Sequence, residues 1–229
     1  MGFAPVERFG DAPEKHHPSS LCKDAQTVIV IGKTVPKGML HSPGYSLYFT
    51  HRSYHSVYPL LDEMALEVCN LIEKQGHLAV PVPSFAPLTF HGPEPWGILS
   101  LKHAAALTGT GAFGRSGMVY HPQYGSMLRF GAVVTSAVLP GDEIIKDDPC
   151  PSKCRACMDA CPSGAFSEDG FAKMKCRAYT IRHGIYPLAL KDEESRKNVE
   201  MIINTAGYNY WLNCIECLKA CPNNNRKPR

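Results

Sequence analysis

The feature that most constrains this chain of 229 residues is the placement of its ten cysteines. Eight of them lie in the last 80 residues, where a Cys-x2-Cys-x3-Cys-Pro run occurs twice. One further cysteine precedes the first run, and another stands alone between the two runs. In chain order the eight are Cys150, Cys154, Cys157, Cys161, Cys176, Cys214, Cys217 and Cys221.

This spacing is typical of proteins that hold two iron–sulfur clusters. A Cys-x2-Cys loop brings two thiolates to one cluster, and in two-cluster ferredoxins the cysteine before the proline ligates the other cluster. Applied here, the pattern predicts two [4Fe-4S] clusters and therefore electron transfer. One cluster would take Cys150, Cys154, Cys157 and Cys221. The other would take Cys161, Cys176, Cys214 and Cys217.

Structural zinc and disulfides are the two other uses that such cysteines have. Structural zinc also takes pairs of Cys-x2-Cys, but it gives no reason for the Cys-x3-Cys-Pro extension. Disulfides require an oxidising compartment, and no export signal is visible. Cys150 stands one residue earlier than a Cys-x2-Cys step to Cys154 would place it, which leaves a [3Fe-4S] cluster open at this position.

Composition narrows the class of protein. Hydrophobic residues make up 44% and charged residues 20%, as in a globular chain. The first residues have no signal-peptide core, and no apolar run is long enough to span a membrane. We therefore expect a soluble, cytoplasmic protein with no membrane partner. The net charge of +3 is too weak to predict a nucleic-acid partner.

The residues before the cysteine runs predict a separate α+β domain. Pro-, Gly-, Tyr- and His-rich stretches at 33–56 and 83–97 favour loops. The expected domains are residues 1–144 and 145–229. Apolar segments of strand length predict strands at 27–32, 77–82, 117–120 and 127–138.

Helical periodicity appears in two places in this domain. Leu61, Ala65 and Cys69 share one apolar stripe, which predicts a helix that ends at Gly76. Cys69 is therefore expected to be an inert core thiol. A shorter helix is expected over residues 97–107.

A glycine-rich segment, GTGAFGRSG at 109–117, follows that helix. It is a poor candidate for dinucleotide binding, because it does not follow a strand and no acidic residue stands at the expected place downstream. The glycines could form a tight turn with positive φ angles, or let the backbone approach a flat cofactor. The residues alone do not decide between the two.

The segment LKHAAALTGTGAFGRSGMVYHPQYGSMLRFGAVVTSAVL, followed by KCRACMDACPSGAF, resembles the epoxyqueuosine reductases and the catalytic part of reductive dehalogenases. HRSYHSVYPLLDEMALEVCNLIEKQG and MKCRAYTIRHG extend the resemblance, which runs from about residue 20 to 225. It implies a nitroreductase-like α+β domain followed by a bacterial dicluster ferredoxin-like domain, with base-off cobalamin. By this resemblance the corrinoid is lined by Gly109, Gly111, Gly114, Arg115, Ser116, Gly117, Tyr124, Gly125 and Ser126.

The function implied by the resemblance is a corrinoid-dependent reductase fed by a low-potential donor of the ferredoxin or flavodoxin type. The proton-donating aspartate of that family would fall near Pro95, so the candidate catalytic residues are Glu94, His121 and Tyr124. The chain stops eight residues after Cys221, so we expect the tRNA-recognition domain to be absent and the substrate to be a different one. The alternative is a non-catalytic dicluster electron carrier or a corrinoid-reducing partner protein.

Overall fold

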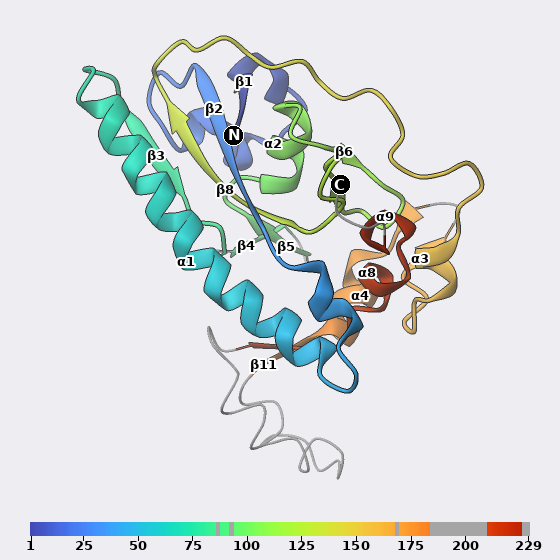
Figure 1. The fold of residues 1–229 in the computed structure, drawn as a ribbon. Coiled ribbons are helices and arrows are strands. Elements are labelled where there is room, and N and C mark those ends of the chain that lie inside the picture. Colours follow the sequence, from blue (N-terminus) through green and yellow to red (C-terminus); the bar gives the residue numbers. More distant parts are fainter. Residues whose placement is uncertain (86–87, 92–93, 168–169, 184–209, 226–229) are drawn as a thin grey trace. The chain divides into compact units, whose positions relative to one another are not determined.

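The structure is a computed structural model that describes residues 1–85, 88–91, 94–167, 170–183 and 210–225 (Figure 1). Helices and short strands alternate along it, which confirms the α+β class. The chain divides into two compact units. Among the described residues, unit 1 comprises Met1–Val35 and Val57–Ser152. Unit 2 comprises Pro36–Ser56 and Lys153–Lys227.

Unit 1 is built on a four-stranded antiparallel sheet with the order β1-β2-β8-β3. Its strands are β1 (Gly2–Pro5), β2 (Thr27–Thr34), β3 (Ala79–Val82) and β8 (Leu128–Thr135). β2 pairs with β8 along its whole length, and every residue of β8 is buried. The strands predicted at 27–32, 77–82 and 127–138 are confirmed. β1 was not predicted, because four residues ending in proline carry too little alternation to indicate a strand.

Helices cover both faces of this sheet (Figure 1). On one face, α1 (Ser46–Glu73) places Leu61 against β8, where a Cβ on Gly131 would lie 3.4 Å from the Cβ of Leu61. On the other face lies α2 (Leu101–Leu107). Because successive strand residues point to opposite faces, the sheet supports one core on each side. The core on the α2 side includes Val28, Val30, Ala104, Ala105, Phe130 and Ala132.

Two hairpins complete unit 1. The first joins β4 (Leu88–His91) to β5 (Glu94–Gly97), so the expectation of irregular structure over 83–97 is wrong for these strands. The second joins β6 (Ala112–Phe113) to β7 (Val119–Tyr120) and encloses the second half of the glycine-rich segment. Three short 3-10 helices precede β2: η1 (Val6–Phe9), η2 (Glu14–His16) and η3 (Pro18–Ser20).

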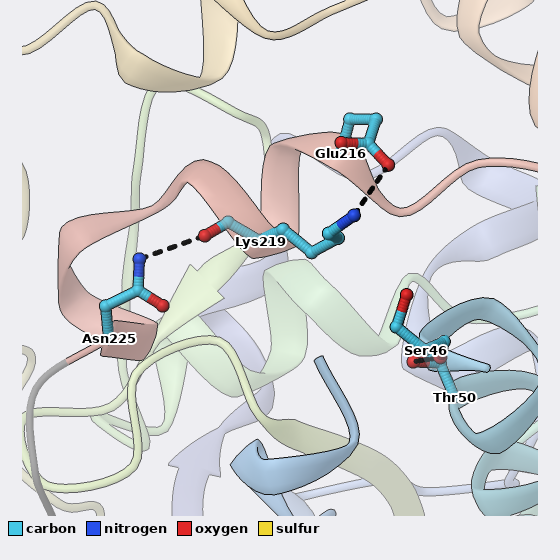
Figure 2. Close-up of polar contacts among 5 residues, drawn as sticks. All are labelled: Ser46, Thr50, Glu216, Lys219 and Asn225. Carbon is cyan, nitrogen blue, oxygen red and sulfur yellow. Dashed lines mark hydrogen bonds and ion pairs between the residues drawn. The ribbon is translucent and has the colours of Figure 1, made fainter. Parts of the chain in front are cut away.

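Helix α1 is much longer than predicted. The expectation of a loop over 33–56 is wrong, because η4 (Lys37–His41) and the first turns of α1 lie there. Inside α1, the Thr50 hydroxyl donates to the Ser46 carbonyl at 2.7 Å, which satisfies the side chain within the helix (Figure 2). The far end agrees with the prediction, since the helix stops at Glu73 and Gly76 has a φ of +84°.

Unit 2 consists of short elements. Its strands form two-stranded ladders, β9 with β10 and β11 with β12. No helix among the described residues of either unit is both long and apolar enough to cross a membrane. The elements are α3 (Ala156–Asp159), β9 (Phe166–Ser167), β10 (Gly170–Phe171), α4 (Lys173–Thr180), β11 (Ile181–His183), β12 (Tyr210–Leu212), α8 (Glu216–Ala220) and α9 (Pro222–Asn225).

The first half of α1 buries two histidines one turn apart. His51 is fully buried and His55 is 7% exposed, and their ring centroids are 4.3 Å apart. Burial, together with the positive charges of His51 and Arg52, lowers the pKa of His55 to about 4. His55 is therefore neutral at pH 7.

This burial makes the stability of the protein depend on pH. Unfolded histidine takes up a proton below about pH 6.5, but folded His55 does so only near pH 4, so stability is lost as the pH falls through this window. Between pH 7.5 and 5.5 we expect His55→Gln to lose about 1 kcal/mol less stability than the parent protein. Anaerobic denaturant unfolding measures this difference. The matched variant at the exposed His77, His77→Gln, should keep the parental slope, and equal slopes in all three proteins would contradict the prediction.

Candidate functional site

The two cysteine runs fold in the same way, and the helices that carry them pack together in unit 2. Cys157 lies on α3 and Cys217 lies on α8. The residues before these helices have similar backbone angles, with φ −119° and ψ 4° at Arg155 and φ −137° and ψ 16° at Ile215. In both copies the carbonyl of this residue accepts the N–H groups three and four residues further on. The repeat in the sequence is therefore also a repeat of local structure.

Four other cysteines surround Cys217. Burial, together with the charges of Cys176, Cys214, Cys157 and Cys161, raises the pKa of the Cys217 thiol to about 12. These neighbours include all three residues that are predicted to share a cluster with Cys217. Burial also raises the pKa of Cys214, and the charges of Cys176 and Cys161 add to the effect. The charge of Cys161 thus acts on both cysteines of the second run, and its place as a ligand of that cluster stays a prediction.

This set of thiols fits an iron–sulfur cluster chemically. Buried thiolates repel one another, and the positive charge of bound iron would offset this repulsion. The described residues include no group of three or more ligand side chains able to hold a single metal ion. In a four-iron cluster each thiolate binds a different iron atom, so its ligands stand further apart than those of one ion.

Cys161 has its own hydrogen-bond environment. Burial raises the pKa of its thiol, but hydrogen bonds from Ser163, Ala165 and Gly164 outweigh burial, and the net shift is downward. The Ala165 N–H donates to the Cys161 Sγ at 3.4 Å. Donors around a ligating sulfur stabilise the thiolate form that binds metal.

Asparagines fix the end of α8, where Cys221 begins the turn into α9. The Asn225 side chain donates to the Lys219 carbonyl at 2.9 Å (Figure 2), and the buried Asn224 donates to the Leu218 carbonyl at 3.0 Å. These bonds satisfy carbonyls that a helix end leaves without partners. Sequence analysis missed both residues, although asparagines directly after a Cys-Pro step were a usable signal.

The glycine-rich segment packs against its own chain. A Cβ on Gly111 would lie 2.7 Å from the backbone carbonyl oxygen of Tyr120. A Cβ on Gly114 would lie 2.7 Å from the Cδ2 atom of the Tyr120 ring. A Cβ on Gly109 would meet the carbonyl oxygen of Glu143. The packing of the β6–β7 hairpin thus accounts for Gly111 and Gly114, and the approach of Glu143 accounts for Gly109. Their contact with a corrinoid stays a prediction.

The turn between β6 and β7 contains three more of the predicted cofactor residues. The Gly117 N–H donates to the Gly114 carbonyl at 2.9 Å, which places Arg115 and Ser116 at the centre of a β-turn. The Ser116 hydroxyl lies 3.0 Å from the hydroxyl of Tyr120, and both side chains are buried. The structure therefore presents Arg115 at this turn and withdraws Ser116 into it.

The candidate proton donors lie on two different segments. His121 and Tyr124 face each other with ring centroids 4.8 Å apart, in a loop closed by paired backbone bonds between His121 and Gly125. Tyr124 is 37% exposed, whereas Ser126 is buried. Glu94 begins β5, opposite His91 of β4. The structure brings His121 and Tyr124 together.

His121 is held as a neutral ring. Its Nδ1 accepts the N–H of Gln123 at 3.0 Å, which leaves the ring proton on Nε2. Burial lowers the pKa of His121, and the charge of the N-terminal amine lowers it further. Tyr124 is the more exposed of the two side chains, and the role of either as a proton donor stays a prediction.

The curated proteins that this chain resembles in sequence include several epoxyqueuosine reductases. No family model matches the chain. Epoxyqueuosine reductase from Lactococcus garvieae is 27% identical over 218 residues, which cover 92% of this chain and 55% of that protein. The enzyme from Synechocystis is 29% identical over 225 residues, covering 93% and 68%. The chain is similar in sequence to the epoxyqueuosine reductases. It spans about half the length of most of the first curated relatives that it matches.

Solved structures share the fold of this chain. An epoxyqueuosine reductase with a modified tRNA stem loop matches with a TM-score of 0.63 at 22% identity, covering 100% of this chain and 62% of that one. A catabolic reductive dehalogenase with 3-bromo-4-hydroxybenzoic acid matches with a TM-score of 0.60 at 16% identity, covering 88% and 31%.

Proposed function

We propose that this chain is an iron–sulfur oxidoreductase that passes electrons through two [4Fe-4S] clusters to a bound base-off corrinoid, for a reductive reaction on a small or nucleic-acid-borne substrate. The proposed nitroreductase-like corrinoid domain takes residues 1–144 except Pro36–Ser56, and the proposed dicluster ferredoxin-like domain takes residues 145–229 together with Pro36–Ser56. The electron donor is a low-potential ferredoxin or flavodoxin of the cytoplasm. The proposed cluster ligands are Cys150, Cys154, Cys157 and Cys221 for one cluster, and Cys161, Cys176, Cys214 and Cys217 for the other.

The observation that carries this proposal is the gathering of cysteines from separate runs around Cys217. Cys161 belongs to the first run and Cys176 to neither, yet the charges of both act on Cys217 and Cys214. A protein that bound one structural zinc ion with each run would not need cysteines from outside the second run near Cys217. Two-cluster ferredoxins require such cysteines.

The chain supplies particular groups to the proposed reaction. When bound, the corrinoid supplies a strong reductant and nucleophile that can cleave a carbon–oxygen or carbon–halogen bond. Tyr124 is the proposed proton donor, because its phenol is partly exposed while its ring is steadied by His121. Glu94 is the second candidate donor. Arg115, at the exposed turn of the glycine-rich segment, is proposed to bind the corrinoid periphery.

Anaerobic reconstitution with iron, sulfide and cobalamin tests both cofactors at once. We expect about eight irons and eight sulfides per chain for two clusters, and an absorption spectrum of bound, base-off cobalamin. Two zinc ions per chain without labile sulfide would overturn the cluster assignment. Tyr124→Phe should keep both cofactors and lower turnover.

The electron-carrier function is kept as the second candidate, because the glycines of the segment are accounted for by their own hairpin. In this case the protein hands electrons to a separate partner. Full clusters together with no cobalamin binding by titration would establish the carrier and refute the reductase.

A further inference from the structure

The sulfur of Cys150 is held by the turn at the end of β6. The Arg115 N–H donates to the Cys150 Sγ at 3.4 Å, across 35 residues of sequence. A Cβ on Gly114 would lie 3.2 Å from the same sulfur, so the turn approaches Cys150 closely because residue 114 has no side chain. Within unit 1, the predicted cluster ligand and the glycine-rich segment are therefore in direct contact.

Both sides of this contact are fixed. The Cys150 N–H donates to the Asp148 carboxylate at 2.8 Å, which sets the backbone that carries the sulfur. The turn rests on the ring of Tyr120, which is 4% exposed and whose hydroxyl lies 3.0 Å from the Ser116 hydroxyl. A buried tyrosine bonded to the turn leaves the Arg115 N–H little freedom to point elsewhere.

We propose that the Gly114–Gly117 turn positions Cys150 as a cluster ligand, and that the Arg115 N–H tunes the reduction potential of that cluster. This inference rests on the proposed function, since it takes Cys150 to bind iron. It also gives a reason for the three residues between Cys150 and Cys154: the sulfur is placed by a distant turn and not by a Cys-x2-Cys loop. Cys150 then completes a four-iron cluster, and the [3Fe-4S] alternative is removed.

The direction of the effect follows from charge. Reduction adds an electron to the cluster, and much of the added charge appears on its sulfur ligands. An N–H that points at such a sulfur stabilises the reduced state, so it raises the reduction potential. Without this hydrogen bond the potential should be more negative.

The Arg115 N–H can be removed by a substitution that keeps the Gly114–Gly117 turn. Arg115 is the second residue of the β-turn, the position that proline favours. Arg115→Pro therefore deletes the donor, whereas Arg115→Ala deletes only the side chain. In anaerobic redox titrations followed by EPR, we expect Arg115→Pro to shift one of the two clusters to a more negative potential. Arg115→Ala removes the same positive charge but keeps the N–H, so its potential for that cluster should lie clearly above that of Arg115→Pro.

Each other result bears on one of the two proposals. Parental potentials in Arg115→Pro, or equal shifts in both variants, would overturn the inference and leave the proposed function intact. Wild-type protein without clusters would instead refute the proposed function.

A second variant keeps the test decisive if Arg115→Pro does not fold. Gly114→Ala places a methyl group against the sulfur and the ring of Tyr120. We expect its iron content to fall from about eight to about seven, with a [3Fe-4S] EPR signal. The control is Gly10→Ala, where the nearest atom, the carbonyl oxygen of Glu7, lies 3.7 Å from the new Cβ. Parental iron content and potentials in Gly114→Ala would overturn the inference.

Discussion

Replacing Cys161 by alanine is expected to damage the cluster of the second cysteine run and not that of its own run. The charge of Cys161 acts on both Cys217 and Cys214, which are about 55 residues further along the chain. Loss of one ligand should lower the iron content from about eight toward about four per chain, as one cluster is lost. EPR of the reduced protein identifies which cluster survives.

The reciprocal variant sharpens this result. Cys221→Ala should damage the cluster held by Cys150, Cys154 and Cys157, and leave the second cluster intact. Cys22→Ser and Cys69→Ser are matched controls, because both thiols are buried in unit 1 and lie outside the cysteine runs. If each ligand variant harms only the cluster of its own run, the crossed arrangement is wrong.

Replacing Gly111 by valine is expected to destabilise the protein by about 3 kcal/mol, the cost of forcing a side chain into a packed interior. The new Cβ would lie 2.7 Å from the Tyr120 carbonyl oxygen and 2.7 Å from a methyl group of Val119. Backbone atoms of a paired strand cannot move aside as a flexible side chain can. Anaerobic denaturant unfolding measures the loss.

The comparison variant is Gly38→Ala, where no atom lies within 4 Å of the added Cβ. It should change the unfolding midpoint little, and by much less than Gly111→Val. A parental midpoint in Gly111→Val would show that the hairpin can open to accept a side chain. The same space would then be available to a flat ligand, as one interpretation of the sequence holds.

The pattern of apolar residues in the sequence predicted the strands and helices that pair or pack regularly. TVIVIG is an apolar run with the length of a buried strand, and Leu61 and Ala65 share one helical face, so β2 and the second half of α1 were predictable. The first half of α1 was not, because its tyrosines and histidines resemble loop composition. Tertiary burial of side chains such as His51 stabilises that half and outweighs local preference.

Part of the candidate site was likewise predictable from the sequence, and part was not. Repeated spacing in the sequence identified the cysteines, because the chemistry of a cluster imposes that spacing. The contact between Arg115 and Cys150 uses a backbone N–H, which no residue type reveals. The asparagines that cap α8 and the hairpin that surrounds Gly111 likewise depend on backbone atoms brought together by folding.

The division of the chain into units bears on how the protein can be dissected. Unit 2 draws Pro36–Ser56 from the N-terminal part of the sequence. Within it η4 packs against α8, and the Lys37 ammonium donates to the Asn223 carbonyl at 3.3 Å. A gene fragment encoding only residues 145–229 would therefore lack part of its own folding unit. A minimal electron-transfer module must carry this N-terminal insert in cis through a linker, or receive it as a co-expressed peptide.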